Sequence, residues 1–378
     1  MATIIFVGHE ATRSGAPFTQ LHLMQWIKEN TSHKMVLVLL KGGPLIAEFE
    51  KLADTYIIDS PKFSFPKRVW SKLNRVAGKD HSNTMDEIAK YVPDVIFASS
   101  LFAINYGVKL KNKLGIKLIC NIHELEFPFF YMPQHNFPAA LLKTDLFMMG
   151  SQAVKEFYIN NFAINKDKAS VIYDFIADEE PTPFTSSDIN AIYNIPINSK
   201  IVGAMGSVDF RKGHDIFLRV AREVLNVSPD TYFMWVGGNK NAGEYKVLER
   251  DIMLSGLSDR VIIPGEQADI HNYYNAFDIF LMTSREDPFP LVCLESALAN
   301  TPIICFEHSG GMPEFIRDDA GYVVDYLDTN QMAMRTLELL ENDALRNQMG
   351  AVGRERALNN HTIGKLGPSI LALIESAL

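Results

Sequence analysis

Short runs of β-branched and other apolar residues alternate along the chain with longer segments in which apolar residues recur every three or four positions. The longer segments, such as 18–29, have the spacing of amphipathic helices. The short runs predict strands at 3–7, 35–40, 56–59, 95–98, 117–120, 146–149, 201–205, 232–236, 261–263, 279–282 and 303–306. Strands that are apolar almost throughout are typical of parallel sheets covered by helices on both faces. The pattern therefore predicts an α/β fold of doubly wound sheets.

A change in pattern divides the chain in two. Residues 178–188 contain two prolines and several acidic residues without apolar periodicity, which is typical of a linker. We therefore expect an N-terminal domain at 1–177, a linker at 178–198 and a C-terminal domain at 199–355, with 356–378 a helix that packs back on the first domain. The expected architecture is two Rossmann-like domains facing across a cleft, with ligands at the carboxyl ends of the strands.

Composition and charge narrow the possible functions. Of the 378 residues, 47% are hydrophobic and 21% are charged, which excludes a disordered chain. The formal net charge of −9 argues against a nucleic-acid partner. Residues 1–177 hold 20 basic and 16 acidic residues, whereas the remainder holds 16 and 29. This asymmetry indicates two modules with different neighbours.

Cysteine usage and the N-terminus bear on the compartment. The three cysteines lie in apolar runs, as expected of buried thiols under reducing conditions, and no Cys/His cluster has zinc spacing. The first apolar run, 4–7, is too short for a signal peptide, and no run of about 18 apolar residues occurs. We therefore expect a cytoplasmic protein.

Two glycine-containing loops follow predicted strands and precede predicted helices. The first, 8–17, includes Gly15 and Ala16, whose small side chains allow a ligand to approach the backbone; it fits either an anion site or a plain turn. It contains neither a dinucleotide-binding fingerprint nor a Walker loop. The second contains Arg211, Lys212 and Gly213, and it fits either a phosphate site or a solvated basic turn.

Carboxylates form the third candidate group. Asp287 and Glu295 are separated by a loop and the start of a predicted helix, an arrangement that suits hydrogen bonding to sugar hydroxyls. The alternatives are a helix cap at Asp287 or Glu286 and a surface charge at Glu295. A further glycine pair, Gly310-Gly311, follows the strand at 303–306 and fits either a simple turn or another backbone contact to an anion.

Taken in order, these segments resemble the retaining glycosyltransferases of the GT-B fold, specifically family four (glycosyl transferases group 1). The resemblance covers nearly the whole chain, and its most specific part is Asp287…Glu295. It rests on residues 14–16, His123-Glu124, 171–175, 211–213, 236–238, 273–278, Asp287…Glu295 and 310–314.

The resemblance implies a transferase of the EC 2.4 class that moves a sugar from a nucleotide diphosphate sugar to a glycan or lipid-linked acceptor with retention of configuration. It implies catalytic roles for His123, Asp287 and Lys212. Front-face attack with the leaving phosphate as base requires no enzymic nucleophile. No cofactor or metal is expected, since protein cations neutralise the diphosphate. The implied donor-binding residues are Gly15, Ala16, Arg211, Lys212, Glu286, Pro290, Leu291, Val292 and Glu295.

The chain departs from the family pattern at three positions. Ser207 stands where an arginine is common, Asp287 where glutamate is usual, and Asp174-Phe175 where Asn-Gly is usual. These departures keep two alternatives open: a nucleotide-sugar epimerase of the same fold, or a degenerate transferase subunit that binds a partner.

Two segments of the first half bear on the acceptor. Segment 61–79 interleaves lysines and arginines with aromatic residues, which suits anionic lipid at the inner membrane face, a lipid-diphosphate acceptor or a solvated basic surface. Segment 125–132 is apolar and aromatic, and it forms either a wall of an acceptor pocket or part of the core.

Overall fold

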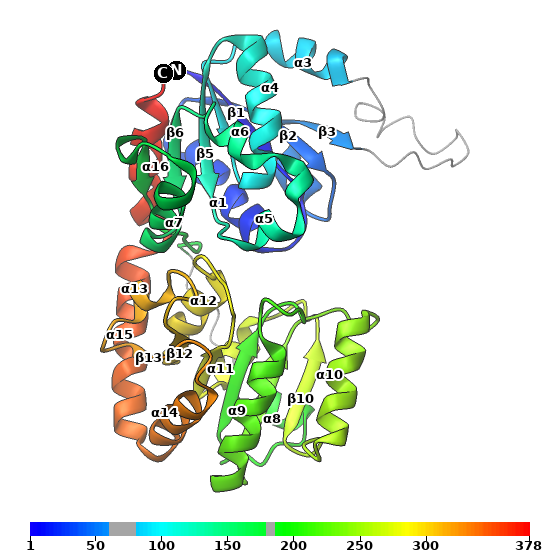
Figure 1. The fold of residues 1–378 in the computed structure, drawn as a ribbon, viewed down its shortest axis with the longest axis vertical. Coiled ribbons are helices and arrows are strands. Elements are labelled where there is room, and N and C mark those ends of the chain that lie inside the picture. Colours follow the sequence, from blue (N-terminus) through cyan, green and yellow to red (C-terminus); the bar gives the residue numbers. More distant parts are fainter. Residues whose placement is uncertain (60–80, 179–185) are drawn as a thin grey trace, which may run out of the picture. The chain divides into compact units, whose positions relative to one another are not determined.

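The computed structural model describes residues 1–59, 81–178 and 186–378, and it divides the chain into two compact units (Figure 1). The first unit comprises Met1–Ala177 and Ile363–Leu378, and the second comprises Asp178–Thr362. The basic and aromatic segment 61–79 lies outside the described residues.

The first unit is built on a seven-stranded parallel sheet with the order β3-β2-β1-β4-β5-β6-β7. Its strands are β1 (Thr3–Gly8), β2 (Lys34–Lys41), β3 (Asp54–Asp59), β4 (Val95–Ala98), β5 (Lys117–Ile122), β6 (Leu146–Met149) and β7 (Ala169–Val171). Its helices are α1 (Gly15–Asn30), α2 (Ile46–Glu50), α3 (His81–Ala89), α4 (Ile104–Leu114), α5 (Phe127–Tyr131), α6 (Phe137–Leu141), α7 (Gln152–Phe162) and α16 (Ile363–Glu375).

The second unit is built on a six-stranded parallel sheet with the order β10-β9-β8-β11-β12-β13. Its strands are β8 (Ile201–Met205), β9 (Tyr232–Val236), β10 (Val261–Gly265), β11 (Ile279–Met282), β12 (Ile303–Phe306) and β13 (Gly321–Val324). Its helices are α8 (Ser186–Ile192), α9 (His214–Val227), α10 (Gly243–Leu254), α11 (His271–Ala276), α12 (Leu291–Leu298), α13 (Met312–Ile316), α14 (Thr329–Glu341) and α15 (Asp343–Asn360).

Continuous apolar strands bury both faces of each sheet. In β1, Ile5 and Val7 belong to one hydrophobic cluster, whereas Ile4 and Phe6 belong to another. Successive side chains of a strand point to opposite faces, so a strand that is apolar throughout requires helices on both sides. The predicted α/β class with two doubly wound parallel sheets is confirmed. All eleven predicted strands form, and β7 and β13 are additional.

The chain returns to the first unit at its C-terminal end. The predicted segment 356–378 contains the end of α15, which continues through Asn360, and all of α16. Helix α16 packs against α1, and the red helix lies beside the first unit's sheet in Figure 1. The close approach occurs at Gly367, where an added Cβ would meet the ring of Trp26. Within the described ranges, no helix combines the length and apolar character needed to cross a membrane.

The strand order reverses direction once in each sheet. In the first unit the reversal lies between β1 and β4, and in the second it lies between β8 and β11. At such a point the loops after the two neighbouring strands run in opposite directions, which leaves room for a ligand between them. Each unit therefore offers a ligand-binding position at the carboxyl ends of these two strands.

Candidate functional site

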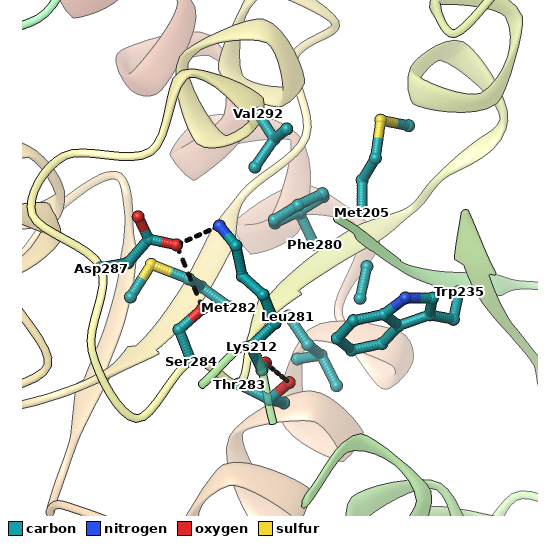
Figure 2. A pocket seen from close by; sticks show the side chains of 11 residues that line it. Met205, Lys212, Trp235, Phe280, Leu281, Met282, Thr283, Ser284, Asp287 and Val292 are labelled. Carbon is teal, nitrogen blue, oxygen red and sulfur yellow. Dashed lines mark hydrogen bonds and ion pairs between the residues drawn. The ribbon is translucent and has the colours of Figure 1, made fainter. Parts of the chain in front are cut away.

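The loops that follow β8 and β11 bring Lys212 and Asp287 together. Nζ of Lys212 lies 2.5 Å from Oδ2 of Asp287, and the Ser284 hydroxyl donates to the same oxygen at 3.2 Å (Figure 2). Both charged side chains are largely buried, with 15% of Lys212 and 8% of Asp287 exposed. The alternative of a solvated basic turn therefore does not hold for Lys212, whose charge is paired with Asp287.

Asp287 is held ionised by the cations around it. Burial acts to raise the pKa of Asp287, but the charges of Lys212 and Arg211 outweigh it, so the pKa lies below its usual value. Nη1 of Arg211 lies 3.8 Å from Oδ2 of Asp287 and donates to the carbonyl oxygen of Glu286 at 2.8 Å. Two cations, Lys212 and Arg211, therefore share the Asp287 carboxylate.

A second ion pair fixes the loop that carries these cations. Arg285 donates from both terminal nitrogens to Asp215, each at 2.9 Å, and its guanidinium lies 3.8 Å from the ring centroid of Phe210. The amide of Arg285 also donates to the carbonyl oxygen of Arg211 at 2.8 Å. The 210–215 and 284–287 segments are thus tied together through backbone and side chain.

Glycines allow the surrounding loops to approach each other. Gly213 has φ +74°, and Gly310 has φ +139°. A Cβ at Gly213 would collide with the carbonyl oxygen of Thr283, and one at Gly310 would collide with the carbonyl oxygen of Asp287. The backbone amide of Asp287 donates to the carbonyl oxygen of Ser309 at 2.6 Å. The glycines that the sequence offered as ligand contacts therefore position the carboxylate loop.

Glu295 projects from α12 and has a specific partner. The Tyr274 hydroxyl donates to its Oε2 at 2.7 Å. Burial raises the pKa of Glu295 despite this hydrogen bond and the nearby His271. Helix α12 starts after Pro290, so Leu291 and Val292 supply its first amides. The N-cap of α12 is thus Pro290, and neither Asp287 nor Glu286 caps it.

In the first unit, His123 lies within a buried polar cluster after β5. Its Nδ1 is 2.7 Å and 2.9 Å from the two oxygens of Asp174, and Nδ2 of Asn121 is 2.7 Å from its Nε2. Burial acts to lower the pKa of His123, but the carboxylates of Asp174 and Glu124 raise it overall. Both ring nitrogens are therefore engaged by the chain itself.

The first glycine loop lies at the strand reversal of the same unit. Gly15 and Ala16 open α1, and Gly15 is exposed. His9 and Ser100, from the loops after β1 and β4, are joined by a hydrogen bond of 3.0 Å. The Glu124 carboxylate accepts from the amides of Leu101 and His123. Small residues and polar groups thus gather at the carboxyl ends of this sheet too.

Within each unit the structure joins some of the predicted residues. Lys212, Arg211, Glu286 and Asp287 form one cluster, and Glu295 lies on the helix that follows it. Sequence reasoning gave no role to Tyr274, Asn121 or the Arg285–Asp215 pair. Asp174 was noted as part of the matching segment 171–175 and as a departure from the family pattern, with no role assigned to it. Among the described residues, no group of three His, Cys, Asp or Glu side chains is arranged to hold a metal ion.

Comparison with known families gives this geometry its context. Residues 186–356 match the model of the glycosyl transferases group 1. This segment of the chain is similar in sequence to that family. The match includes Arg211, Lys212, Asp287 and Glu295, so the cation and carboxylate clusters lie within the family domain.

Related sequences extend the comparison. The chain is 27% identical over 210 residues to D-inositol 3-phosphate glycosyltransferase of Corynebacterium diphtheriae, and this match covers 53% of the chain and 49% of that protein. The chain thus spans about half the length of this curated relative. The longer match is to N-acetylgalactosamine-N,N'-diacetylbacillosaminyl-diphospho-undecaprenol 4-alpha-N-acetylgalactosaminyltransferase of Campylobacter jejuni. It is 24% identical over 344 residues and covers 90% of the chain and 82% of that protein.

Solved structures show that the fold is shared over the whole chain. HepE of Anabaena, in complex with UDP and glucose, has a TM-score of 0.82 at 18% identity, with 100% of both chains covered. Sucrose-phosphate synthase of Thermosynechococcus elongatus has a TM-score of 0.77 at 19% identity and covers 100% of this chain and 99% of its own. The chain therefore has the GT-B fold.

Proposed function

We propose that the protein is a retaining glycosyltransferase that moves a hexosyl-type sugar from a nucleotide diphosphate sugar to a glycan or lipid-linked acceptor. One observation carries the proposal: Lys212 and Arg211 share the buried Asp287 carboxylate where the strand order of the family domain reverses. A leaving diphosphate accumulates negative charge, and fixed cations in a buried site stabilise it without solvent reorganisation.

Each charged group has a role in this reaction. Lys212 and Arg211 bind the diphosphate, together with the first amides of α12. Asp287 holds the cations in place and contacts the donor sugar, and Glu295 accepts hydrogen bonds from the ribose hydroxyls. His123, whose two ring nitrogens contact the side chains of Asp174 and Asn121, shapes the region of the first unit that faces the donor sugar.

The reaction needs no nucleophile from the chain. The acceptor hydroxyl oxygen bonds to the anomeric carbon on the face from which the phosphate leaves. The bond between that carbon and the phosphate oxygen breaks, and its electrons remain on the diphosphate. The hydroxyl proton passes to a phosphate oxygen, so atoms and charge balance. The cations act by stabilising the leaving group.

We propose that the protein cations replace a divalent ion, and activity should therefore persist in EDTA. Names of relatives support the acceptor class: the Campylobacter jejuni protein is named for a diphospho-undecaprenol-linked substrate, and its name specifies an alpha linkage. The neighbour from Anabaena was solved with UDP and glucose, which supports a nucleotide sugar as donor.

The test is nucleotide release from UDP-, GDP- and ADP-sugars, with free glycans and undecaprenyl-diphosphate-linked sugars as acceptors. We expect release of one nucleoside diphosphate that depends on an acceptor, and NMR of the product should show the donor's anomeric configuration. Conversion of the donor sugar without nucleotide release would instead identify an epimerase. Absence of turnover and binding with every donor would identify a degenerate subunit.

A further inference from the structure

The buried Tyr274 directs its hydroxyl to the carboxylate of Glu295. The hydroxyl of Tyr274 donates to Oε2 of Glu295 at 2.7 Å, from α11 to the neighbouring α12. Only 2% of Tyr274 is exposed. A buried phenol hydroxyl generally requires a partner, and here the partner is the carboxylate proposed to bind ribose.

Packing fixes the position of this tyrosine. Its ring lies 6.4 Å from that of Phe277, edge to face, and 6.3 Å from that of Phe280. Its backbone carbonyl oxygen accepts from the Thr301 hydroxyl at 3.5 Å. The hydroxyl is therefore presented to Glu295 by a rigid aromatic cluster, and it selects one orientation of the carboxylate.

The same contact affects the charge of Glu295. Burial raises the pKa of Glu295, and the groups that act against burial are the Tyr274 hydroxyl and the exposed His271. The Cys293 thiol is the other titratable group nearby, and burial raises its pKa well above the usual value. An ionised carboxylate is the stronger acceptor for hydroxyl groups. A hydroxyl that favours ionisation therefore favours ribose binding.

We infer that Tyr274 is a positioning residue that occupies one carboxylate oxygen of Glu295, so that the other oxygen is presented, ionised, to the ribose hydroxyls of the donor. This inference rests on the proposed function. It adds a residue from α11 to the nucleotide site, whereas the loops after β8 and β11 supply the charges that bind the diphosphate.

Helix α11 provides a matched pair of variants. Tyr274→Phe removes the hydroxyl that reaches Glu295 and keeps the ring in its aromatic cluster. Tyr273→Phe, the control, removes the hydroxyl of the adjacent buried tyrosine, which lies 2.8 Å from the Tyr193 hydroxyl. Each variant loses one oxygen from neighbouring positions, but only Tyr274→Phe loses the contact with Glu295, whereas Tyr273→Phe loses the contact with Tyr193.

The first experiment uses no ligand and measures the melting temperature of each variant from pH 5 to pH 8. Because the folded pKa of Glu295 lies above its ordinary value of 4.5, ionisation opposes folding as pH rises through that window. Without the Tyr274 hydroxyl, ionisation costs more. We expect the melting temperature of Tyr274→Phe to fall further below that of wild type as pH rises. For Tyr273→Phe the difference from wild type should stay constant with pH. In a Glu295→Gln background, the effect of Tyr274→Phe on the melting temperature should no longer depend on pH.

The second experiment measures calorimetric affinity for UDP and 2′-deoxy-UDP at pH 7.5. We expect wild type and Tyr273→Phe to prefer UDP by about tenfold, corresponding to one hydrogen bond to a charged group, and Tyr274→Phe to lose most of this preference. Equal preference in Tyr274→Phe and wild type would overturn the inference, as would a pH-independent deficit in the first experiment. If wild type binds no UDP, GDP or ADP, the proposed function fails, and the unfolding data alone decide whether Tyr274 controls the ionisation of Glu295.

Discussion

Each unit buries an ion pair at the carboxyl ends of its parallel strands, and the two pairs differ in what they leave for a ligand. In the first unit, one imidazole, His123, lies against Asp174 and Asn121, so both of its nitrogens are engaged. In the second unit, one carboxylate, Asp287, faces both Lys212 and Arg211. In the first arrangement the chain itself occupies both ring nitrogens, whereas in the second two cations share one carboxylate, an arrangement that suits a polyanion.

From this contrast we propose different roles for the two clusters, which could not be distinguished from the sequence. The resemblance gave catalytic roles to His123 and Lys212 alike. The geometry separates them, because Lys212 belongs to a cluster whose two cations can pair with a diphosphate. His123 instead joins the loop after β5 to Asp174, beyond the end of β7. We therefore expect mutations in the second unit to affect nucleotide binding most strongly.

The largest effect should follow from removing Lys212. Lys212→Ala leaves the buried Asp287 with the Ser284 hydroxyl and the more distant cation of Arg211, and we expect a loss of about 3–5 kcal/mol in unfolding free energy. Turnover should fall by roughly tenfold or more, about 1.4 kcal/mol of transition-state stabilisation. Chemical denaturation and steady-state kinetics measure the two effects, with the exposed Lys246→Ala as control.

A double variant separates stability from binding in this prediction. Lys212→Ala with Asp287→Asn removes the unpaired charge, so most of the lost stability should return while nucleotide affinity stays low. Recovery of affinity in the double variant would show that Lys212 serves only to neutralise Asp287, and the contrast between the two units would not hold.

An intermediate effect is expected at the glycine that shapes the carboxylate loop. Gly310→Ala places a Cβ against the carbonyl oxygen of Asp287 at a φ that favours glycine, and we expect a cost of about 1–3 kcal/mol. UDP affinity should fall with it, because the loop would carry Asp287 away from Lys212. Gly243→Ala is the control, since no atom lies within 4 Å of the added Cβ. Unchanged melting and affinity in Gly310→Ala would contradict the loop's role.

The smallest effect is expected at the His123–Asp174 pair of the first unit. Asp174→Asn keeps the shape of the side chain and removes its charge, so the pKa of His123 should fall. Because a raised imidazole pKa stabilises the fold below about pH 6.5 and this contribution is lost as pH rises through the folded pKa, the variant should lose about 1 kcal/mol at mildly acidic pH and less at alkaline pH. Imidazole NMR titration of His123 in wild type and variant checks the shift. An unchanged His123 titration would refute the pairing.

Most strands and the α/β class could be predicted from the sequence, because the strands of parallel sheets are nearly continuous apolar runs. It missed β7 and β13 because these short strands are only partly buried, as in Gly321–Val324, where Tyr322 and Val323 are partly exposed. Lys212 and Asp287 were recognised individually by residue type. Their contact was not predicted, because 75 residues separate them.

Other parts of the site lacked a local signal. Tyr274 was noted only as part of a matching segment, since its partner Glu295 lies on the next helix of the sequence and the contact depends on how α11 and α12 pack. The strand order supplies the missing information for the main cluster. Once β8 and β11 are neighbours at the reversal, the loops that follow them start from adjacent strand ends, which brings Lys212 within reach of Asp287.

Diphosphate binding by Arg211 and Lys212 is tested most directly by a calorimetric titration with UDP, GDP and ADP, comparing wild type with Arg211→Ala/Lys212→Ala and each diphosphate with its monophosphate. We expect that at least one diphosphate binds and that its monophosphate binds more weakly. The double variant should lose at least tenfold in affinity for the diphosphate while retaining its affinity for the monophosphate. Equal diphosphate affinity in wild type and the double variant, or no binding by wild type, would contradict diphosphate binding by these two residues.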